Sequence, residues 1–312
     1  MKKILVSGGD GFIGRNLITE LLKDDNYIIN IDNNITSYPQ NFNSINYKKI
    51  TADISEIDIN KFVKVDVILH LASVASPLVY KQNPKLVINP NVFGSKKLIE
   101  IAERDNAKYF FSSTSEVYGH LSEKMLNCNG IREKDDAHIS LLTKRSCYSA
   151  AKRLGEELAL NFYNNGGKGT NFRLFNVYGH DMDLKHIGYG RVIPNFFNKL
   201  RKNEKIKIFG DGKQIRSFLW IDDLIEALIK IINLESILPN VINIGNDEPV
   251  SIIKLSNLIG SKLNCIPEIE VIKRDKDDPL WRRPNIDLVK SLIKWFPRTN
   301  LDVGLSLIAN EY

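Results

Sequence analysis

Tyr148 and Lys152 are the residues whose types and spacing point most directly to chemistry. They stand four positions apart in Tyr-Ser-Ala-Ala-Lys. Positions i and i+4 of a helix lie on one face, so the phenol and the ammonium would be neighbours. A nearby cation favours the phenolate, so Tyr148 could act as a base at neutral pH. Because this spacing also occurs in helices with a surface lysine and a half-buried tyrosine, the prediction depends on the surrounding residues.

A glycine-rich turn, Gly8-x-x-Gly11-x-x-Gly14, follows an apolar run and opens a helical pattern. Glycines there allow a tight turn and a close backbone approach to a pyrophosphate, which then faces the helix N-terminus. Asp32 ends the next apolar run, where a carboxylate can accept hydrogen bonds from both ribose hydroxyls and repels a 2′-phosphate. These residues predict NAD rather than NADP. The alternative is a glycine turn in an unrelated α/β protein.

A polar cluster, Ser113-Thr114-Ser115-Glu116, ends a further apolar run. Ligands of open α/β sheets bind at the carboxyl ends of strands. Thr114 and Ser115 can hydrogen-bond a substrate hydroxyl, and Glu116 can act as an acid or base. Together with the tyrosine and the lysine these residues predict an alcohol-oxidising site. The alternative is a Ser/Thr-rich turn with a solvated glutamate.

Arginines and one aromatic residue of the second half suit a nucleotide diphosphate. Arg216 can offer paired donors to phosphate oxygens, and Phe209 can stack on a base. Arg282 and Arg283 offer further contacts to an anion. Each arginine alone would more often be a surface residue.

Composition narrows the class of protein. The chain has 312 residues, 43% of them hydrophobic and 26% charged, and a formal net charge of +6. This net charge suits an anionic ligand. The sequence has no run of basic residues interleaved with aromatic ones, so we do not expect nucleic-acid binding. Cys128, Cys147 and Cys265 are too few and too scattered for a disulfide framework or a zinc site, and His180 and His186 lack metal spacing. We expect no metal, no signal peptide, no membrane span and a cytoplasmic location.

The residues that could do chemistry need a scaffold, and strand and helix patterns alternate through the first half. We expect strands at Lys3–Ser7, Tyr27–Ile31, Val65–Leu71, Tyr109–Ser113 and Asn171–Phe175, and helices at Phe12–Leu22, Val87–Ala102 and Ser149–Tyr163. This alternation predicts an α/β fold, a Rossmann-like doubly wound parallel sheet covered on both faces.

After about Tyr178 the pattern loosens. We expect a loop at Gly179–Gly190, a charged loop or lid at Lys273–Arg283, helices at Arg191–Leu200, Asp222–Ile232 and Ser251–Ile259, and strands at Ile206–Phe209, Phe218–Ile221 and Val241–Ile244. The predicted division is an NAD-binding domain over 1–178 and a smaller C-terminal substrate-binding domain over 179–312. Later segments return to the first domain.

With these residues in place, the chain resembles the extended short-chain dehydrogenase/reductases of the NAD-dependent epimerase/dehydratase family. The resemblance runs from Lys3 to about Val303. Its motifs are the glycine turn, His70-Leu71-Ala72-Ser73, the Tyr/Lys pair, Arg173-Leu174-Phe175-Asn176-Val177-Tyr178-Gly179 and Gly210-Asp211-Gly212-Lys213-Gln214-Ile215-Arg216.

Within that family the chain is most similar to UDP-glucuronate decarboxylases. Three stretches carry this similarity: Leu71–Pro77 with Tyr80, Ser113–Gly119, and Asp277-Asp278-Pro279 followed by Arg282, Pro284 and Ile286. Simple 4-epimerases usually have a small or polar residue in place of Glu116, and 4,6-dehydratases of dTDP-glucose have Asp in place of Ser115. The chain departs from the family at Ser7, at His180-Asp181, over Gly119–Arg145 and at Ser149-Ala150-Ala151, and most of these positions border the expected sugar site.

The resemblance implies an NAD-dependent lyase that oxidises C4 of a nucleotide sugar, expected to be UDP-linked, releases CO₂ and reduces the product. The alternatives are 4-epimerisation, 4,6-dehydration and, more remotely, a non-catalytic NAD sensor. It implies a homodimer that pairs through the Val87–Ala102 helix and the helix bearing the Tyr/Lys pair. The implied catalytic residues are Thr114, Ser115, Glu116, Tyr148, Lys152 and Arg282. The implied cofactor residues are Gly8, Gly11, Phe12, Ile13, Asp32, Asn33, Asp53, Ile54, Leu71, Ala72, Tyr148 and Lys152. The implied substrate residues are Asn176, Arg191, Phe209, Arg216 and Arg282.

Overall fold

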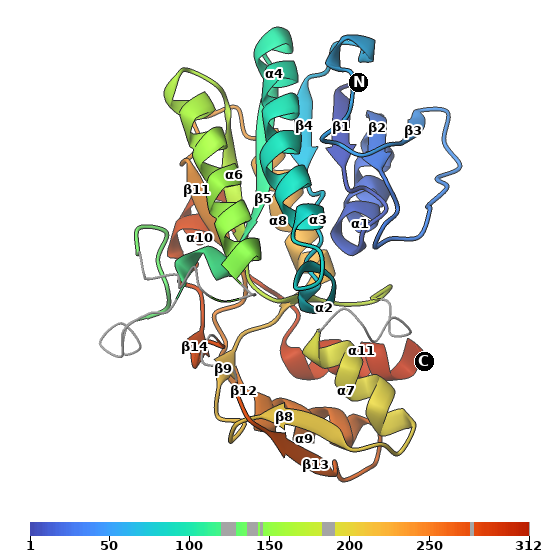
Figure 1. The fold of residues 1–312 in the computed structure, drawn as a ribbon, viewed down its shortest axis with the longest axis vertical. Helices are drawn as coiled ribbons and strands as arrows, with labels where there is room; N and C mark the ends of the chain where they lie inside the picture. The colour runs from blue at the N-terminus through green and yellow to red at the C-terminus, as the bar shows by residue number, and fades with distance from the viewer. Residues whose placement is uncertain (120–128, 136–142, 144–145, 183–190, 275–277, 312) are drawn as a thin grey trace.

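Seven parallel strands form the central sheet of the protein, in the order β11-β6-β5-β4-β1-β2-β3 (Figure 1). The computed structural model describes residues 1–119, 129–135, 143, 146–182, 191–274 and 278–311. The strands are β1 (Lys3–Ser7), β2 (Tyr27–Asp32), β3 (Tyr47–Thr51), β4 (Val67–His70), β5 (Lys108–Thr114), β6 (Gly169–Leu174) and β11 (Val241–Ile244). The doubly wound α/β fold expected from the sequence is therefore confirmed.

Helices cover both faces of this sheet because the strand residues are apolar on both sides. Alternate residues such as Val6 and Leu5 belong to two separate cores. The first core holds helices α1 (Phe12–Leu21) and α8 (Ile221–Asn233); the second holds α4 (Ser95–Asp105) and α6 (Ser146–Asn164). In Figure 1 α4 and α6 run side by side in front of the strands, with α8 behind.

A second group of elements lies beyond the carboxyl ends of the strands, in the lower part of Figure 1. Its strands pair as β7 with β10, β8 with β13, and β9 with β12 and β14. These are β7 (Val177–Tyr178), β8 (Ile206–Phe209), β9 (Ile215–Arg216), β10 (Leu219–Trp220), β12 (Val250–Ser251), β13 (Ile269–Ile272) and β14 (Trp281–Arg282). Its helices include α7 (Val192–Arg201), α9 (Ile252–Lys262) and α11 (Leu301–Glu311), while α10 (Asp287–Ile293) contacts β11. Ser251 caps α9, as expected, by accepting from the Lys254 amide at 3.3 Å.

Strands β7, β9, β12 and β13 and helices α2 (Pro77–Tyr80), α10 and α11 were not expected from the sequence, and β14 lies in the stretch that was expected to be a loop. Two further differences have an evident physical reason. Strand β3 was not expected, because Lys48 and Lys49 break its apolar pattern at the sheet edge. The helix expected over Val87–Ala102 is divided into α3 (Lys85–Ile88), a π-helical segment at Asn89–Gly94, and α4, which starts at Ser95. Pro90 lies in the π-helical segment and has no N–H to donate, which explains why regular helix is interrupted there. Short helices α2 (Pro77–Tyr80), Leu22–Asp24, Ile59–Lys61 and Ser115–Tyr118 complete the elements.

Strand β11 joins the sheet beside β6, so a segment beyond residue 178 returns to it. The boundary between residues 178 and 179 stays a prediction. His186, Asp277, Cys128 and most of Gly119–Arg145 lie outside the described residues. No helix of the described part is long and apolar enough to cross a bilayer, and that part holds no group of three or more metal-ligating side chains.

Candidate active site

The glycine turn packs so tightly that side chains would not fit. Gly8 has φ +76°, and a Cβ atom built on it would lie 2.6 Å from the Ala72 amide nitrogen. A Cβ atom on Gly14 would lie 2.3 Å from the Gly8 carbonyl oxygen. Helix α1 starts directly after Gly11, which is its N-cap residue. Glycine has no side chain that could cap the helix, so the first amides of α1 face the turn. This cradle fits a dinucleotide pyrophosphate.

Asp32 lies at the end of β2 beside this turn and is 8% exposed. Its carboxylate accepts from the Asp10 amide at 3.0 Å, the Asn34 amide at 2.8 Å and the Ser37 hydroxyl at 2.9 Å. Burial raises the pKa of Asp32, although these hydrogen bonds oppose the shift. The side chain of Asn33 donates to Asp53 at 3.2 Å, so the structure brings these two predicted cofactor residues together.

The other predicted cofactor residues lie around the same strand ends. Leu71 follows β4 and its amide donates to the Ser7 carbonyl at 2.9 Å, while Ile54 is buried. His70 approaches the Pro90 carbonyl at 2.9 Å through Nε2 and the Ser7 hydroxyl at 2.6 Å through Nδ1. A carbonyl only accepts, so Nε2 carries the proton and Nδ1 accepts. Burial lowers the pKa of His70 to about 3, and the neutral ring ties β1 and β4 to the π-helical segment.

Lys152 is 2% exposed on α6, and its Nζ donates to the Ser112 carbonyl of β5 at 2.5 Å. The ammonium also lies 4.8 Å from the centre of the Phe111 ring. Burial lowers the pKa of Lys152 to about 7, while the charge of Glu156 opposes that shift. The lysine therefore joins the catalytic helix to the strand whose end carries the polar cluster.

Tyr148 lies among four other polar or aromatic side chains. Loss of solvent raises the pKa of its phenol to about 12, and the charge of Glu116 adds to that shift. A hydrogen bond from Thr114 and the charge of Arg191 lower the pKa. The ring stacks on that of Tyr80, with centroids 5.5 Å apart and planes 9° apart. The sequence led us to expect that Lys152 lowers the pKa of the phenol; in the protein alone the pKa is raised, because desolvation is the larger effect.

Glu116 and Arg282 are far apart in sequence and meet at the end of β5. Nη2 of Arg282 lies 4.0 Å from Oε2 of Glu116, and the arginine is 3% exposed on β14. Ser115 is buried, and the Thr114 hydroxyl accepts from the Glu116 amide at 3.3 Å. The structure thus brings Thr114 and Glu116 to the tyrosine, and Arg282 to Glu116.

The predicted substrate residues divide into two sets. Arg191 lies over the Phe12 ring at 5.3 Å and close enough to Tyr148 to lower its pKa, so it sits at the reacting end. Arg216 lies opposite Arg282 in the β9–β14 pairing and forms an ion pair with Asp278 at 2.8 Å. The remaining predicted residues are Asn176, which donates to the Ser217 carbonyl at 3.0 Å, and Phe209, which ends β8 and is 47% exposed.

Two neighbours of the site were not predicted as site residues. Tyr80 is 2% exposed and forms one wall against the Tyr148 ring. Asp278 fixes the guanidinium of Arg216. Both residues stand in stretches that carried the family resemblance, and this position was the signal that could have pointed to them. No pattern in the neighbouring sequence indicated a role for either residue.

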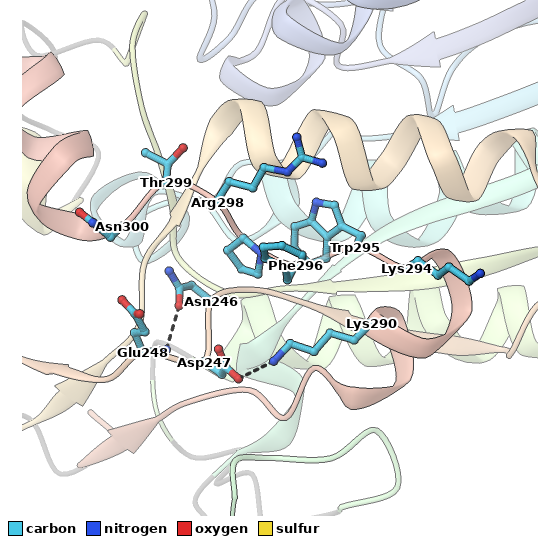
Figure 2. A pocket seen from close by; sticks show the side chains of 11 residues that line it. Asn246, Asp247, Glu248, Lys290, Lys294, Trp295, Phe296, Arg298, Thr299 and Asn300 are labelled. Carbon is cyan, nitrogen blue, oxygen red and sulfur yellow. Dashed lines mark hydrogen bonds and ion pairs between the residues drawn. The ribbon is translucent and has the colours of Figure 1, made fainter.

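Figure 2 shows a cavity of about 830 Å³ that contains none of the predicted site residues. It is lined by Asn246, Asp247, Glu248, Lys290, Lys294, Trp295, Phe296, Pro297, Arg298, Thr299 and Asn300. Lys290 is paired with Asp247 at 2.9 Å, and Arg298 lies 3.4 Å from Glu226. Two of its three basic lining side chains, Lys290 and Arg298, are thus paired with carboxylates.

Comparison with known proteins agrees with this geometry. The model of the NAD-dependent epimerase/dehydratase family matches residues 4–245. UDP-glucuronic acid decarboxylase 4 of Arabidopsis thaliana is 32% identical over 99% of this chain and 68% of its own length. UDP-glucuronic acid decarboxylase 1 of Danio rerio is 32% identical over 98% of this chain and 71% of its own length. A UDP-N-acetylglucosamine 4-epimerase from Methanobrevibacter ruminantium M1, solved with UDP-N-acetylmuramic acid, has TM-score 0.87 and 26% identity over 99% of this chain and 97% of that one.

The buried Lys152 predicts a pH-dependent stability. An unfolded lysine keeps its proton up to its ordinary pKa of 10.5, whereas the folded one loses it near pH 7. Between these values the unfolded state binds more protons, so wild-type stability rises with pH relative to a Lys152→Met variant. We expect a relative gain of up to about 1.4 kcal/mol per pH unit.

Urea unfolding of both proteins at pH 7 and pH 9 measures this difference. Lys48→Met, which removes an exposed lysine from β3, is the control and should track the wild type. Identical pH dependence of the wild type and Lys152→Met would show that the folded lysine keeps an ordinary pKa.

Proposed function

The chain belongs to the NAD-dependent epimerase/dehydratase family and is an NAD-dependent enzyme, and from this premise we propose that it decarboxylates UDP-glucuronate. The observation that carries the proposal is the buried guanidinium of Arg282 beside Glu116, whose charge in turn acts on Tyr148. A buried cation at the sugar end suits a substrate with a carboxylate. The decarboxylases that are 32% identical to this chain support the same assignment.

NAD would be held by the glycine cradle at Gly8, Gly11 and Gly14 and by Asp32, and when bound it accepts and returns a hydride. Asp32 would accept from the ribose hydroxyls, because its carboxylate lies at the end of β2 beside that cradle. The Tyr148 phenol would take the proton of the C4 hydroxyl. Thr114, which already hydrogen-bonds the phenol, would orient the C4 oxygen together with Ser115.

The ketone at C4 makes the C5 carboxylate part of a β-keto acid. When the bond from C5 to the carboxylate breaks, CO₂ leaves and the electron pair delocalises into an enolate on the C4 oxygen. Arg282 would hold the carboxylate and Glu116 would steer the ring or shuttle a proton to C5. Reduction of C4 then gives UDP-xylose, with the phenol returning its proton.

The first test is one incubation with UDP-glucuronate, followed by chromatography and mass spectrometry. We expect a product lighter by one CO₂, and no product with Tyr148→Phe, because that variant lacks the proton acceptor. An unchanged mass with altered retention would instead mean epimerisation, the activity named for the 26% identical structures. Water loss from UDP- or dTDP-glucose without turnover of the acid would mean dehydration.

We assign Arg216 to the diphosphate, because it lies at the register position of Arg282 on the adjacent strand. Arg216→Ala should raise KM for the nucleotide sugar about tenfold or more and leave kcat nearly unchanged, since a diphosphate is held equally in ground and transition states. Steady-state kinetics measure both constants. Lys213→Ala, which removes an exposed cation three residues before Arg216, is the control. A loss confined to kcat would contradict a binding role.

We further propose a homodimer that pairs through the face of α3, the π-helical segment and α6, which contact one another. Apolar side chains stand exposed on this face, with Phe93 at 54%, Leu154 at 47% and Ile88 at 37%. Phe93→Glu/Leu154→Glu should give the mass of one chain by light scattering, while Ile237→Glu, at a position 99% exposed on another segment, should not. A wild type with the mass of one chain at micromolar concentration would overturn the proposal.

We also place the enzyme in the cytoplasm, where the thiols of Cys147 and Cys265 would stay reduced.

A further inference from the structure

The glycine turn contains a buried negative charge. Asp10 stands between Gly8 and Gly11 and is 1% exposed. Its Oδ2 lies 2.6 Å from Nζ of Lys49, whose side chain is 22% exposed. Lys49 lies opposite Asn30 in the β2–β3 pairing, so both side chains point to the same face of the sheet.

Hydrogen bonds connect this ion pair to the rest of the turn. Asn30 donates to Asp10 Oδ1 at 2.8 Å, and Oδ1 of Asn30 accepts from the Gly9 amide at 3.0 Å. Asn34 donates to Asp10 Oδ2 at 2.6 Å. The Asp10 amide in turn donates to Asp32, the residue assigned to the ribose. The charge state of Asp10 therefore acts on both the shape of the turn and its electrostatics.

Two buried carboxylates, Asp10 and Asp32, lie together where a dinucleotide brings an anionic pyrophosphate. Like charges at short range in a desolvated site repel strongly. The charge of Asp10 adds to the burial that raises the pKa of Asp32. A buried charge is tolerated when it is paired and hydrogen-bonded, and Lys49 supplies the cation here.

We propose that Lys49 is a positioning residue for NAD: it neutralises Asp10 inside the glycine turn and so keeps the turn able to receive the pyrophosphate. The proposal rests on NAD binding, which the family establishes, and is independent of which sugar reaction follows. The lysine acts through Asp10, so replacing both members of the pair should cost less affinity than replacing the lysine alone.

The test measures the Kd of NAD by titration calorimetry on protein freed of bound nucleotide, with far-UV circular dichroism as the check of folding. Lys49→Met should raise the Kd about tenfold or more. Lys48→Met removes the same charge from the exposed, opposite face of β3 and should leave the Kd unchanged. Asp10→Asn/Lys49→Met removes both charges of the pair and should return the Kd to within about threefold of the wild type.

An unchanged Kd in Lys49→Met would overturn the proposal, as would a double variant that binds as weakly as the single one. If Lys49→Met does not fold, the double variant and Asp10→Asn decide the matter. Asp10→Asn removes the anion and keeps the lysine, so it should bind NAD at least as tightly as the wild type. Weaker binding by that variant would mean that the carboxylate itself, and not its neutralisation, is what the turn requires.

Discussion

The bond between the buried ammonium of Lys152 and the Ser112 carbonyl is the interaction on which the site depends. It fixes α6 against β5, so the helix that carries Tyr148 and the strand end that carries Thr114 keep one relative position. One turn further along α6, Glu156 accepts from Arg173 of β6 through two hydrogen bonds of 2.9 and 2.7 Å. The helix is thus held to two adjacent strands by charged groups that have little freedom to move. Burying a lysine opposes its charged form, and the protein tolerates this because the carbonyl and the Phe111 ring face the ammonium.

A second network brings Arg282 to the site from the C-terminal part of the chain. The Ile131 amide donates to the Arg283 carbonyl at 2.8 Å, and the Ile131 carbonyl accepts from the amide of Asn285 at 2.8 Å. Asn243 of β11 also donates to the Ile131 carbonyl at 2.8 Å and accepts from the Tyr118 hydroxyl at 2.6 Å. The segment after β14 is therefore pinned to the loop that follows the catalytic strand. Arg282 has its place because the backbone on its C-terminal side is bonded to elements of the large sheet.

These two networks explain how much the sequence could predict. The glycine turn, Asp32 and the polar end of β5 are local signals, because each follows a run of strand residues and depends on its immediate neighbours. The meeting of Glu116 with Arg282 could be expected only from the resemblance, since pairing across more than half the chain leaves no local pattern. Strand β3 was not predicted, because a lysine at position 49 is typical of a surface residue and its ion pair with Asp10 leaves no signal in the local sequence. The interruption of the helix at Pro90 was not predicted, because the helical spacing of apolar residues continues on both sides of the proline.

The direction of the Tyr148 pKa shift was not predictable either, and it has a consequence for catalysis. A phenol with a pKa of about 12 is protonated at neutral pH, so the ligand-free protein holds no base at this position. The ammonium of Lys152 donates to the Ser112 carbonyl of β5, and burial lowers its own pKa to about 7, so near neutral pH the lysine is only partly charged. Arg191 does lower the pKa of the phenol, while Glu116 raises it. The pairing of Glu116 with Arg282 reduces the negative charge that opposes formation of the phenolate. The basicity of Tyr148 therefore depends on the arginines near the expected sugar position as much as on the Tyr/Lys spacing. Bound NAD would supply a further positive charge at this site, and a nearby positive charge favours the phenolate of Tyr148.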